Sequence, residues 1–440
     1  MPFFVPMLKH FQKSSKTLIS PDAWKARIIL WSGAVVVGLL ATGFAIAIEH
    51  ANHFFLSGVS EHPYLPFIVS PLGLMLVAWL TIRYVPEAKG SGIPQAIACL
   101  DLTDHQRRSR MLSLKIALSK IGLCIAGILT GASIGREGPT VHIGASVMFA
   151  LGRFGRFSHH YMDRALILAG GAAGISAAFN TPLAGIIFAI EEMGRSFEER
   201  TNGVLLTAVF MAGITAVALQ GNYTYFGTSS ATLEPAQMLV PVLICGIVGG
   251  ALGGLFAQIL VLSSTKLGQL TGYKPLLLAF ACGLGIAILG WLSGGTTYGT
   301  GYQEAQAIIT GQGEPAEGYA FYKMAATLVS YISGIPGGIF APSLAAGAGV
   351  GQQIAHLLSG YPPGAIIILG MVAYFAGVVQ TPITAFVIVM EMTDNNGLLL
   401  PLMATSLIAY VSSHLVCPEP IYRALAKNFL PAKTEPSQPG

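Results

Sequence analysis

Long apolar stretches with almost no charged residues recur along nearly the whole chain. They occupy residues 28–48, 65–82, 121–135, 165–190, 204–219, 235–265, 275–303 and 324–390. Many exceed the roughly 20 residues that a helix needs to cross a bilayer, and several are long enough for two segments. Only 10% of the 440 residues are charged, against roughly 25% in an ordinary soluble domain. The pattern predicts a polytopic membrane protein with about ten or more segments.

These apolar stretches do not alternate with polar residues, as the strands of a membrane β-barrel would. We therefore predict an all-α fold. The first 27 residues are polar and partly amphipathic and carry Lys9, Lys13 and Lys16, which argues against a cleavable signal peptide. Under the positive-inside rule this basic arm predicts a cytoplasmic N-terminus. A tail that contains Arg423 and Lys427 predicts a cytoplasmic C-terminus in the same way.

The polar parts of the chain are short, so no soluble domain is expected. The segments 105–110 and 296–318 are predicted to be exposed loops, and the last ten residues a disordered tail. The five cysteines are scattered without CxxC spacing, which favours buried packing residues over a metal or redox site. The net charge of +4 requires no nucleic-acid partner.

Two segments of the chain repeat at nearly the same interval. NTPLAGIIFAIEEM at 180–193 aligns without gaps on QTPITAFVIVMEMT at 380–393, an offset of 200 residues. GASIGREGPTVHIGASV at 131–147 aligns on GIPGGIFAPSLAAGAGV at 334–350, an offset of 203. We infer an internal duplication. Many transporters consist of duplicated halves whose sites form from interrupted helices at the repeat interface.

Three glycine and proline clusters supply such interruptions. They are GSGIP at 90–94, GREGP at 135–139 and GGIFAP at 337–342, and each predicts a loop that opens a helix. Inside a membrane, non-helical backbone is tolerated only where protein buries it or where it lines a cavity. Helix N-termini carry unpaired N–H groups and partial positive charge, so several of them together would bind an anion and still release it. The alternative is that these glycines only allow close helix packing.

Taken in order and together with Tyr422 in PEPIYRAL, these motifs closely resemble those of the CLC chloride channels and chloride/proton antiporters. The resemblance covers about residues 28–425. It implies an all-α CLC fold of two inverted-topology repeats with many tilted and broken helices, and a homodimer with one pathway per subunit. It also implies an inner-membrane transporter of bacterial type that has no enzyme activity and no cofactor.

The expected organisation follows from this resemblance. A cytoplasmic segment (1–27) precedes a transmembrane domain (28–425), in which the first repeat covers about 28–220 and the second about 235–425. A short cytoplasmic tail (426–440) without CBS domains completes it.

The resemblance also implies a set of chloride ligands. The hydroxyl of Ser91 and the phenol of Tyr422 would donate to a central anion, together with the backbone amides of Ile339 and Phe340. Without the resemblance, Ser91 would be interpreted as a packing or capping serine and Tyr422 as an interfacial aromatic. An outer anion position would be formed by backbone amides of Gly135, Arg136 and Gly138.

Two glutamates are predicted to carry gating and proton transfer. Placing a carboxylate inside a membrane costs free energy, so such a residue is interpreted by default as a functional one. The resemblance implies that Glu137 occupies the outer anion position, blocks the path, and leaves when it is protonated. The alternative is a salt bridge with Arg136, which is itself interpreted as a helix-end anchor or a positive bias for anions. Glu192 matches the internal proton-transfer glutamate of the antiporters, unless Glu191 and Glu192 merely end a helix at the cytoplasmic surface.

Coupled chloride/proton exchange is thus the predicted function, and a passive chloride channel is the main alternative. Fluoride or nitrate transport is disfavoured by the GREGP and GSGIP patterns. An intramembrane enzyme is disfavoured because the chain has no HExxH motif and no GxSG context at its serines. Lys120 is expected to be a helix-end anchor, or else to tune the local field. His142 is expected to be a packing histidine rather than a proton relay, and Glu391 receives no role.

Overall fold

Apolar runs interrupted by glycine and proline fold here into many helices of unequal length, as the pattern predicts. The computed structural model describes residues 21–155, 159–194, 199–313 and 316–431. The lysines at positions 9, 13 and 16 lie outside these residues. Within the described part, the only β pairing consists of two isolated bridges, so the all-α prediction is confirmed.

The first half of the chain, as far as it is described, contains nine of these helices, and a π-helical turn, η3 (Ala189–Gly194), continues α9. Their bounds are α2 (Pro21–Glu61), α3 (Pro66–Tyr84), α4 (Ile93–Asp101), α5 (His105–Met111), α6 (Leu114–Leu129), α7 (Glu137–Gly152), α8 (His159–Phe179), α9 (Pro182–Phe188) and α10 (Glu199–Gln220). Short 3-10 turns follow α3 and α7, at η1 (Pro86–Ala88) and η2 (Arg153–Gly155).

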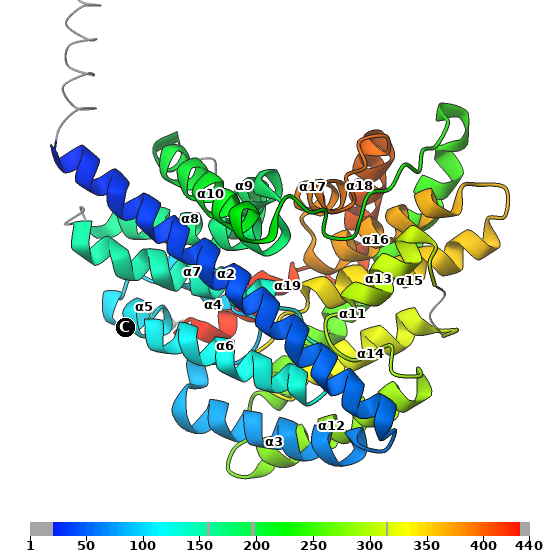
Figure 1. The fold of residues 1–440 in the computed structure, drawn as a ribbon, viewed down its shortest axis with the longest axis horizontal. Coiled ribbons are helices and arrows are strands. Elements are labelled where there is room, and N and C mark those ends of the chain that lie inside the picture. Colours follow the sequence, from blue (N-terminus) through cyan, green and yellow to red (C-terminus); the bar gives the residue numbers. More distant parts are fainter. Residues whose placement is uncertain (1–20, 156–158, 195–198, 314–315, 432–440) are drawn as a thin grey trace, which may run out of the picture.

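The second half contains α11 (Leu239–Leu267), α12 (Lys274–Leu292), α13 (Tyr302–Thr310), α14 (Tyr319–Ile332), α15 (Phe340–Leu357), α16 (Pro363–Val379), α17 (Pro382–Thr393), α18 (Leu399–Val416) and α19 (Ile421–Ala426). The 3-10 turns η4 (Pro235–Gln237) and η5 (Lys427–Phe429) flank it. Figure 1 shows α2 running diagonally across the front of the molecule, with α9, α10, α17 and α18 along one side and α3 and α12 on the opposite side.

Eight helical stretches of the described chain are long and apolar enough to cross a membrane, and α16 and α17 are shorter apolar helices. The estimate of ten or more segments is thus met only when shorter helices are included. The reason is visible in the run 324–390, which is divided among α14, α15, α16 and α17. The break at GGIFAP and the break before Pro382 are buried, whereas the break between α15 and α16 is exposed at Leu357.

The duplication is confirmed by backbone conformation. Gly131 and Gly334 have φ of 83° and 85°, and Asn180 and Gln380 have φ of 57° and 58°. A positive φ is unusual for residues other than glycine, so its recurrence at Asn180 and Gln380 is a specific match. The helices that follow the first pair also begin 203 residues apart, α7 at Glu137 and α15 at Phe340.

Two polar segments differ from the prediction of exposed loops. The segment 296–318 contains α13, in which Ala305 and Ile308 are buried. The segment 105–110 lies in α5, where Asp104 caps the helix by accepting hydrogen bonds from Gln106 N and Arg107 N at 2.8 and 3.3 Å. In the first segment the turn-forming glycines and threonines flank a helix that packs on the protein, whereas in the second a local cap forms a helix that remains largely exposed.

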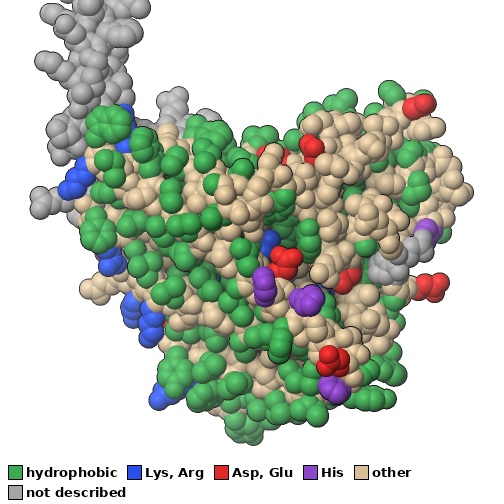
Figure 2. Space-filling model, viewed as in Figure 1, with side chains coloured by type: hydrophobic (Ala, Val, Ile, Leu, Met, Phe, Trp, Pro, Cys, Tyr) green, Lys and Arg blue, Asp and Glu red, His purple; other side chains and the backbone are tan. Residues whose placement is uncertain are grey.

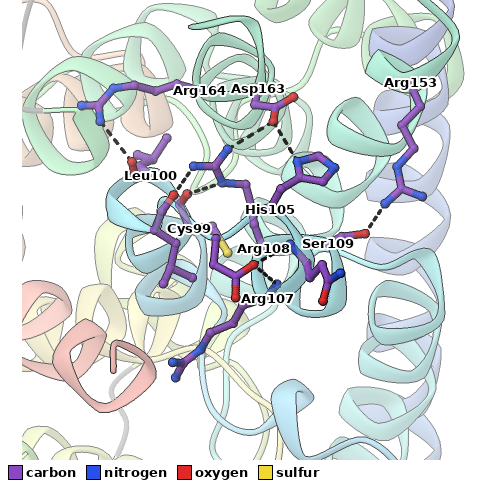
Figure 3. Close-up of polar contacts among 12 residues, drawn as sticks. Cys99, Leu100, His105, Arg107, Arg108, Ser109, Arg153, Asp163 and Arg164 are labelled. Atoms are coloured by element: carbon purple, nitrogen blue, oxygen red, sulfur yellow. Dashed lines mark hydrogen bonds and ion pairs between the residues drawn. The ribbon is translucent and has the colours of Figure 1, made fainter. Parts of the chain in front are cut away.

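Arg108 explains why α5 is held in place (Figure 3). Its guanidinium is buried and donates to the carbonyl oxygens of Cys99, at 3.0 Å, and Leu102, and to Asp163 Oδ2 at 3.2 Å. Arg164 donates to Leu100 O at 3.2 Å. Because the carbonyl end of a helix carries partial negative charge, these two arginines stabilise the end of α4. That helix begins at GSGIP, so its placement matters for the site.

Basic and acidic side chains are distributed unevenly over the surface. On the face shown in Figure 2, most Lys and Arg side chains lie along the edge at which α2 begins, whereas Asp, Glu and His side chains lie in the middle, beside a further basic side chain, and toward the opposite edge. The last described residues return to the basic edge, because Arg107 Nη2 donates to Phe429 O at 2.9 Å. All five cysteines are buried and none forms a disulfide, as expected for packing residues.

Candidate functional site

The three glycine and proline motifs, which are far apart in the sequence, meet at the centre of the molecule. Gly135 and Gly338 exchange two backbone hydrogen bonds of 2.7 and 2.8 Å. Gly90 N donates to Ile335 O at 3.1 Å, and Gly90 O accepts from Gly337 N at 3.2 Å. These bridges join GREGP and GSGIP of the first half to GGIFAP of the second.

Each motif opens a helix, as predicted. The helices α4, α7 and α15 begin at Ile93, Glu137 and Phe340, and each has a proline in its first turn. Gly92 is required immediately before α4. Its φ is 108°, and a Cβ there would lie 2.8 Å from the carbonyl oxygen of Gly138. No other residue type fits that approach without displacing backbone.

Glu137 lies where α7 and α15 begin side by side. Its side chain is fully buried, and its Oε2 accepts a hydrogen bond from Ala341 N at 3.3 Å. The same carboxylate faces the backbone amides of Arg136 and of Glu137 itself. Its Oε1 has no hydrogen-bond partner among the described residues. The carboxylate therefore rests on backbone amides of two helix N-termini, one from each repeat.

Arg136 turns away from this carboxylate. Its guanidinium lies over the Tyr225 ring, 5.7 Å from the ring centroid. The two neighbours form no ion pair in the described chain, so the salt-bridge interpretation is wrong. Arg136 instead lines a cavity of about 370 Å³ together with Glu49, Tyr223 and Tyr302. Since Arg136 is also the N-cap residue of α7, it places positive charge in this cavity, directly before Glu137 in the chain.

The amides predicted for the outer anion position are only partly available. Gly135 N is already donated to Gly338 O at 2.7 Å, so it is not a free donor in this conformation. That bond joins the two repeats and uses the donor that an anion would need. The amide of Arg136 faces the Glu137 carboxylate. Gly138 lies in the first turn of α7, where helix N–H groups have no partner within the helix.

The side chains of Ser91 and Tyr422 are fully buried, and neither hydroxyl has a hydrogen-bond partner in the described chain. A Cβ built on Gly138 would lie 2.1 Å from Ser91 Oγ, so Ser91 touches the first turn of α7. The phenol of Tyr422 is within electrostatic range of both Glu137 and Glu192. An unsatisfied buried polar group costs about 1–3 kcal/mol, so each of these hydroxyls is a buried donor that could bind an acceptor absent from the described chain.

Ile339 and Phe340 open α15, and both are buried. Neither amide is donated to another backbone group of the described chain. The Phe340 ring packs against Phe179, Phe188 and Phe375, with centroid distances of 5.4, 6.4 and 4.4 Å. These rings surround the helix start with apolar surface, which strengthens electrostatic interactions there because it excludes water.

Glu192 is buried, with 1% of its surface exposed. It lies on η3, where α9 changes to π-helical winding. The alternative of a helix end at the exposed surface is therefore wrong. The next residue, Met193, accepts a hydrogen bond through its carbonyl oxygen from Arg423 Nη2 at 2.8 Å. Arg423 also pairs with Asp101 at 3.4 Å. From the sequence, Arg423 was interpreted only as a tail charge, although its position next to Tyr422 was a usable signal.

Lys120 is not a helix-end anchor. It is fully buried within α6, and its Nζ donates to Gly90 O at 3.0 Å, which fixes the loop that carries Ser91. Lys323 makes the same kind of contact in the second half, where its Nζ donates to Thr297 O and Gly299 O at 3.0 and 2.9 Å. Lys323 was not predicted from the sequence, although it follows Lys120 by the repeat offset of 203.

His142 is fully buried in α7, and its Nε2 is hydrogen-bonded to Met111 O at 2.9 Å. Its Nδ1 is buried without a hydrogen-bond partner in the described chain, so the prediction of a packing histidine agrees with the burial of the ring but is satisfied at one ring nitrogen only. Within the described residues, no cluster of three or more His, Cys, Asp or Glu side chains could hold a metal ion.

Comparisons with known proteins agree with this geometry. The family model described as voltage gated chloride channel matches residues 73–414. A protein named H(+)/Cl(-) exchange transporter ClcA from Yersinia pestis is 32% identical over 96% of this chain and 91% of its own length. A protein of the same name from Salmonella paratyphi A is 32% identical over 93% and 90%.

Solved structures give the same result at the level of the fold. A slow cyanobacterial Cl-/H+ antiporter has a TM-score of 0.80 and 26% identity, covering 93% of this chain and 98% of its own. A CLC-type fluoride/proton antiporter has a TM-score of 0.75 and 22% identity over 92% and 98%. At that identity the second likeness concerns the fold alone.

Proposed function

The chain belongs to the voltage gated chloride channel family, and on that basis we propose that it exchanges chloride for protons across a membrane. The relatives that carry this activity in their names are 32% identical over nearly the full chain. The observation that carries the proposal is the arrangement of two buried carboxylates, Glu137 and Glu192, in electrostatic range of one buried phenol.

Chloride would be bound without a full countercharge. The Ser91 and Tyr422 hydroxyls would each donate one hydrogen bond, and the amides of Ile339 and Phe340 would add the positive end of α15. Partial charges hold an anion more weakly than a buried lysine or arginine side chain would, so the anion can also leave. The buried lysine of this region, Lys120, is bonded to a backbone carbonyl instead.

Glu137 would act as the gate. Its carboxylate uses amides of the two helix N-termini, Arg136 on one and Ala341 on the other, which are the donors an anion would use. Protonation removes the charge that those amides favour. The neutral side chain would then leave, and chloride would take its place. One side chain would thus alternate with chloride and carry a proton.

Glu192 would deliver protons from the other side. Its burial in a polar turn beside Arg423 supports this role, since a buried carboxylate is expensive unless it has a function. A passive chloride channel would need no such residue. The carboxylate at this place is therefore what favours exchange over the channel alternative. The GSGIP serine, Ser91, favours chloride over nitrate.

We also propose the assembly and the orientation. All ligands of the proposed pathway come from one chain, which supports one pathway per subunit in a homodimer. The basic edge at the start of α2, to which the described C-terminal residues return, supports cytoplasmic termini by the positive-inside rule. We propose the inner membrane of a bacterium as its location. We also propose that the protein is a transporter and not an enzyme.

The test is proton movement in liposomes that contain the purified protein. When a chloride gradient runs down, we expect protons to move in the opposite direction, and a protonophore to abolish the pH change. Glu192→Gln should keep chloride flux but lose proton movement, since the amide cannot carry a proton in this way. Chloride flux in the unmodified protein without any opposing proton movement would establish the channel alternative.

A further inference from the structure

The two repeats exchange glutamate caps. Glu191, in the first repeat, accepts hydrogen bonds at the start of α17 from Ile383 N at 3.1 Å, from Thr384 N at 2.6 Å and from Thr384 Oγ1 at 2.7 Å. Glu391, in the second repeat, accepts at the start of α9 from Leu183 N at 3.2 Å and Ala184 N at 2.6 Å. Each carboxylate satisfies helix N-terminal amides that have no partner in their own helix.

The two caps are matched in sequence and geometry. Glu191 and Glu391 are separated by the repeat offset of 200. Both α9 and α17 begin with proline after a threonine N-cap, with φ and ψ of −127° and 79° at Thr181 and −126° and 84° at Thr381. Both carboxylates interact favourably with a helix N-terminus. The pair therefore ties the two halves together by equivalent contacts.

The surroundings of the two glutamates are not equivalent. The chain around Glu191 winds as the π-turn η3, and the next residue is the buried Glu192. The chain around Glu391 stays α-helical to the end of α17, and the buried Met392 stands in the place of Glu192. A π-turn is rare and often marks a functional site. The Glu191 cap supports this turn, and it is made by the residue next to Glu192.

The other neighbour of Glu192 is held as well. The carbonyl oxygen of Met193 accepts a hydrogen bond from Arg423, which follows Tyr422 in α19. The turn is thus fixed on one side by α17 of the second repeat and on the other by the helix that presents Tyr422. Its backbone cannot rotate without breaking one of these contacts.

We propose that Glu191 is a positioning residue for the proton-transfer glutamate. Its carboxylate, anchored by hydrogen bonds at the start of α17, holds η3 in the conformation that turns Glu192 toward Tyr422 and the pathway. This inference rests on the proposed exchange function. Glu391 makes the matching cap, but the residue that follows it is Met392 and not a titratable residue. The Glu391 cap therefore stabilises the repeat interface without positioning a proton carrier.

The matched pair Glu191→Gln and Glu391→Gln separates the two roles. Glutamine keeps the size of the side chain, but its NH2 group would face backbone donors and one hydrogen bond would be lost. We expect both variants to unfold at similarly lowered temperatures. Only Glu191→Gln should reduce the number of protons moved per chloride, because a misplacement of about 1 Å can cost about 100-fold in rate. A reduction of about tenfold in proton turnover, with chloride turnover nearly kept, is the expected result.

Two smaller substitutions, both at Thr384, test the same contact if Glu191→Gln does not fold. Thr384→Val removes only the hydroxyl that donates to Glu191, whereas Thr384→Ser keeps it. Thr384→Val should lower the proton to chloride ratio less than Glu191→Gln does, and Thr384→Ser should restore the ratio of the unmodified protein. An unchanged ratio in both Glu191→Gln and Thr384→Val overturns the inference.

An equal loss of coupling in Glu391→Gln also overturns it, because both caps would then act only through the interface. The unmodified protein and Glu192→Gln are measured in the same vesicles. Absence of proton movement already in the unmodified protein would refute the exchange function and the positioning role with it. Normal exchange that is lost in Glu192→Gln leaves the function intact, and the Glu191 result then decides the positioning role alone.

Discussion

At the scale of single residues, Glu137 and Phe340 occupy matching places in the two repeats and do opposite things. Both open a buried helix at the centre of the molecule. Glu137 brings a carboxylate that competes for backbone donors, including Ala341 N of the other repeat. Phe340 brings a ring that packs against other rings and leaves its own amide available. In the proposed mechanism this asymmetry would give one repeat the gate and the other repeat donors alone.

Glu137→Ala is expected to leave chloride movement and abolish its coupling to protons. The methyl group cannot reach the amide of Ala341 and cannot carry a proton, so the path stays open. The measurement is chloride efflux with simultaneous recording of external pH in liposomes. Proton movement that persists at the normal ratio would show that another residue carries the proton and would refute the gate assignment.

The sequence already predicted most residues of this site, because their motifs are contiguous and the family resemblance is specific. Burial of Ser91, Tyr422, Glu137 and Glu192 agrees with those roles. Other contacts could not be predicted, because they join residues far apart in the chain. The hydrogen bond from Gly135 N to Gly338 O occupies one expected anion donor. This hydrogen bond could not be predicted from the residues next to either glycine.

At the scale of elements, glycine determines how closely the central helices approach. A Cβ on Gly144 of α7 would lie 2.1 Å from Gly170 O of α8, and one on Gly170 would lie 2.2 Å from Gly144 O. The second repeat uses Gly351 and Gly370 for the contact of α15 with α16, where a Cβ on Gly370 would lie 2.2 Å from Gly351 Cα. Small residues allow such backbone contact between membrane helices.

Gly170→Ala is therefore expected to destabilise the protein by about 1–3 kcal/mol, because the backbone carbonyl that it meets cannot move aside cheaply. Gly122→Ala in α6 is the matched control, since a Cβ there meets nothing within 4 Å. Thermal unfolding in detergent measures both variants. A control that loses as much stability as Gly170→Ala, or a Gly170→Ala protein as stable as the original, would contradict this account of the helix contact.

Elements that are defined by local pattern were predicted well, and those that are defined by tertiary contacts were not. The helix starts at the three motifs follow from glycine and proline. The helix α5 needs Arg108 to reach the carbonyl oxygens at the end of α4, and the π-turn η3 is held by contacts with α17 and α19. Such partners cannot be identified from spacing along the chain.

At the scale of the whole molecule, the duplication explains how one chain builds a pathway from two halves. The halves meet through reciprocal backbone bonds at the motifs and through reciprocal glutamate caps farther out. The offset of 203 that aligns the motifs also relates Lys120 to Lys323. The architecture was predictable from this offset, whereas the functional differences that we propose between the halves depend on the residues that break the symmetry, Glu137 and Glu192.

In the proposed mechanism, chloride and proton movements are coupled through these two glutamates. The most direct test is uphill transport: liposomes begin with equal chloride inside and outside and with a pH gradient imposed across the membrane. Coupled exchange predicts that protons running down their gradient drive chloride in the opposite direction, so that a chloride gradient builds up, and that Glu192→Gln abolishes this effect. Chloride that remains at equilibrium in the unmodified protein, despite normal chloride permeability, would contradict the account.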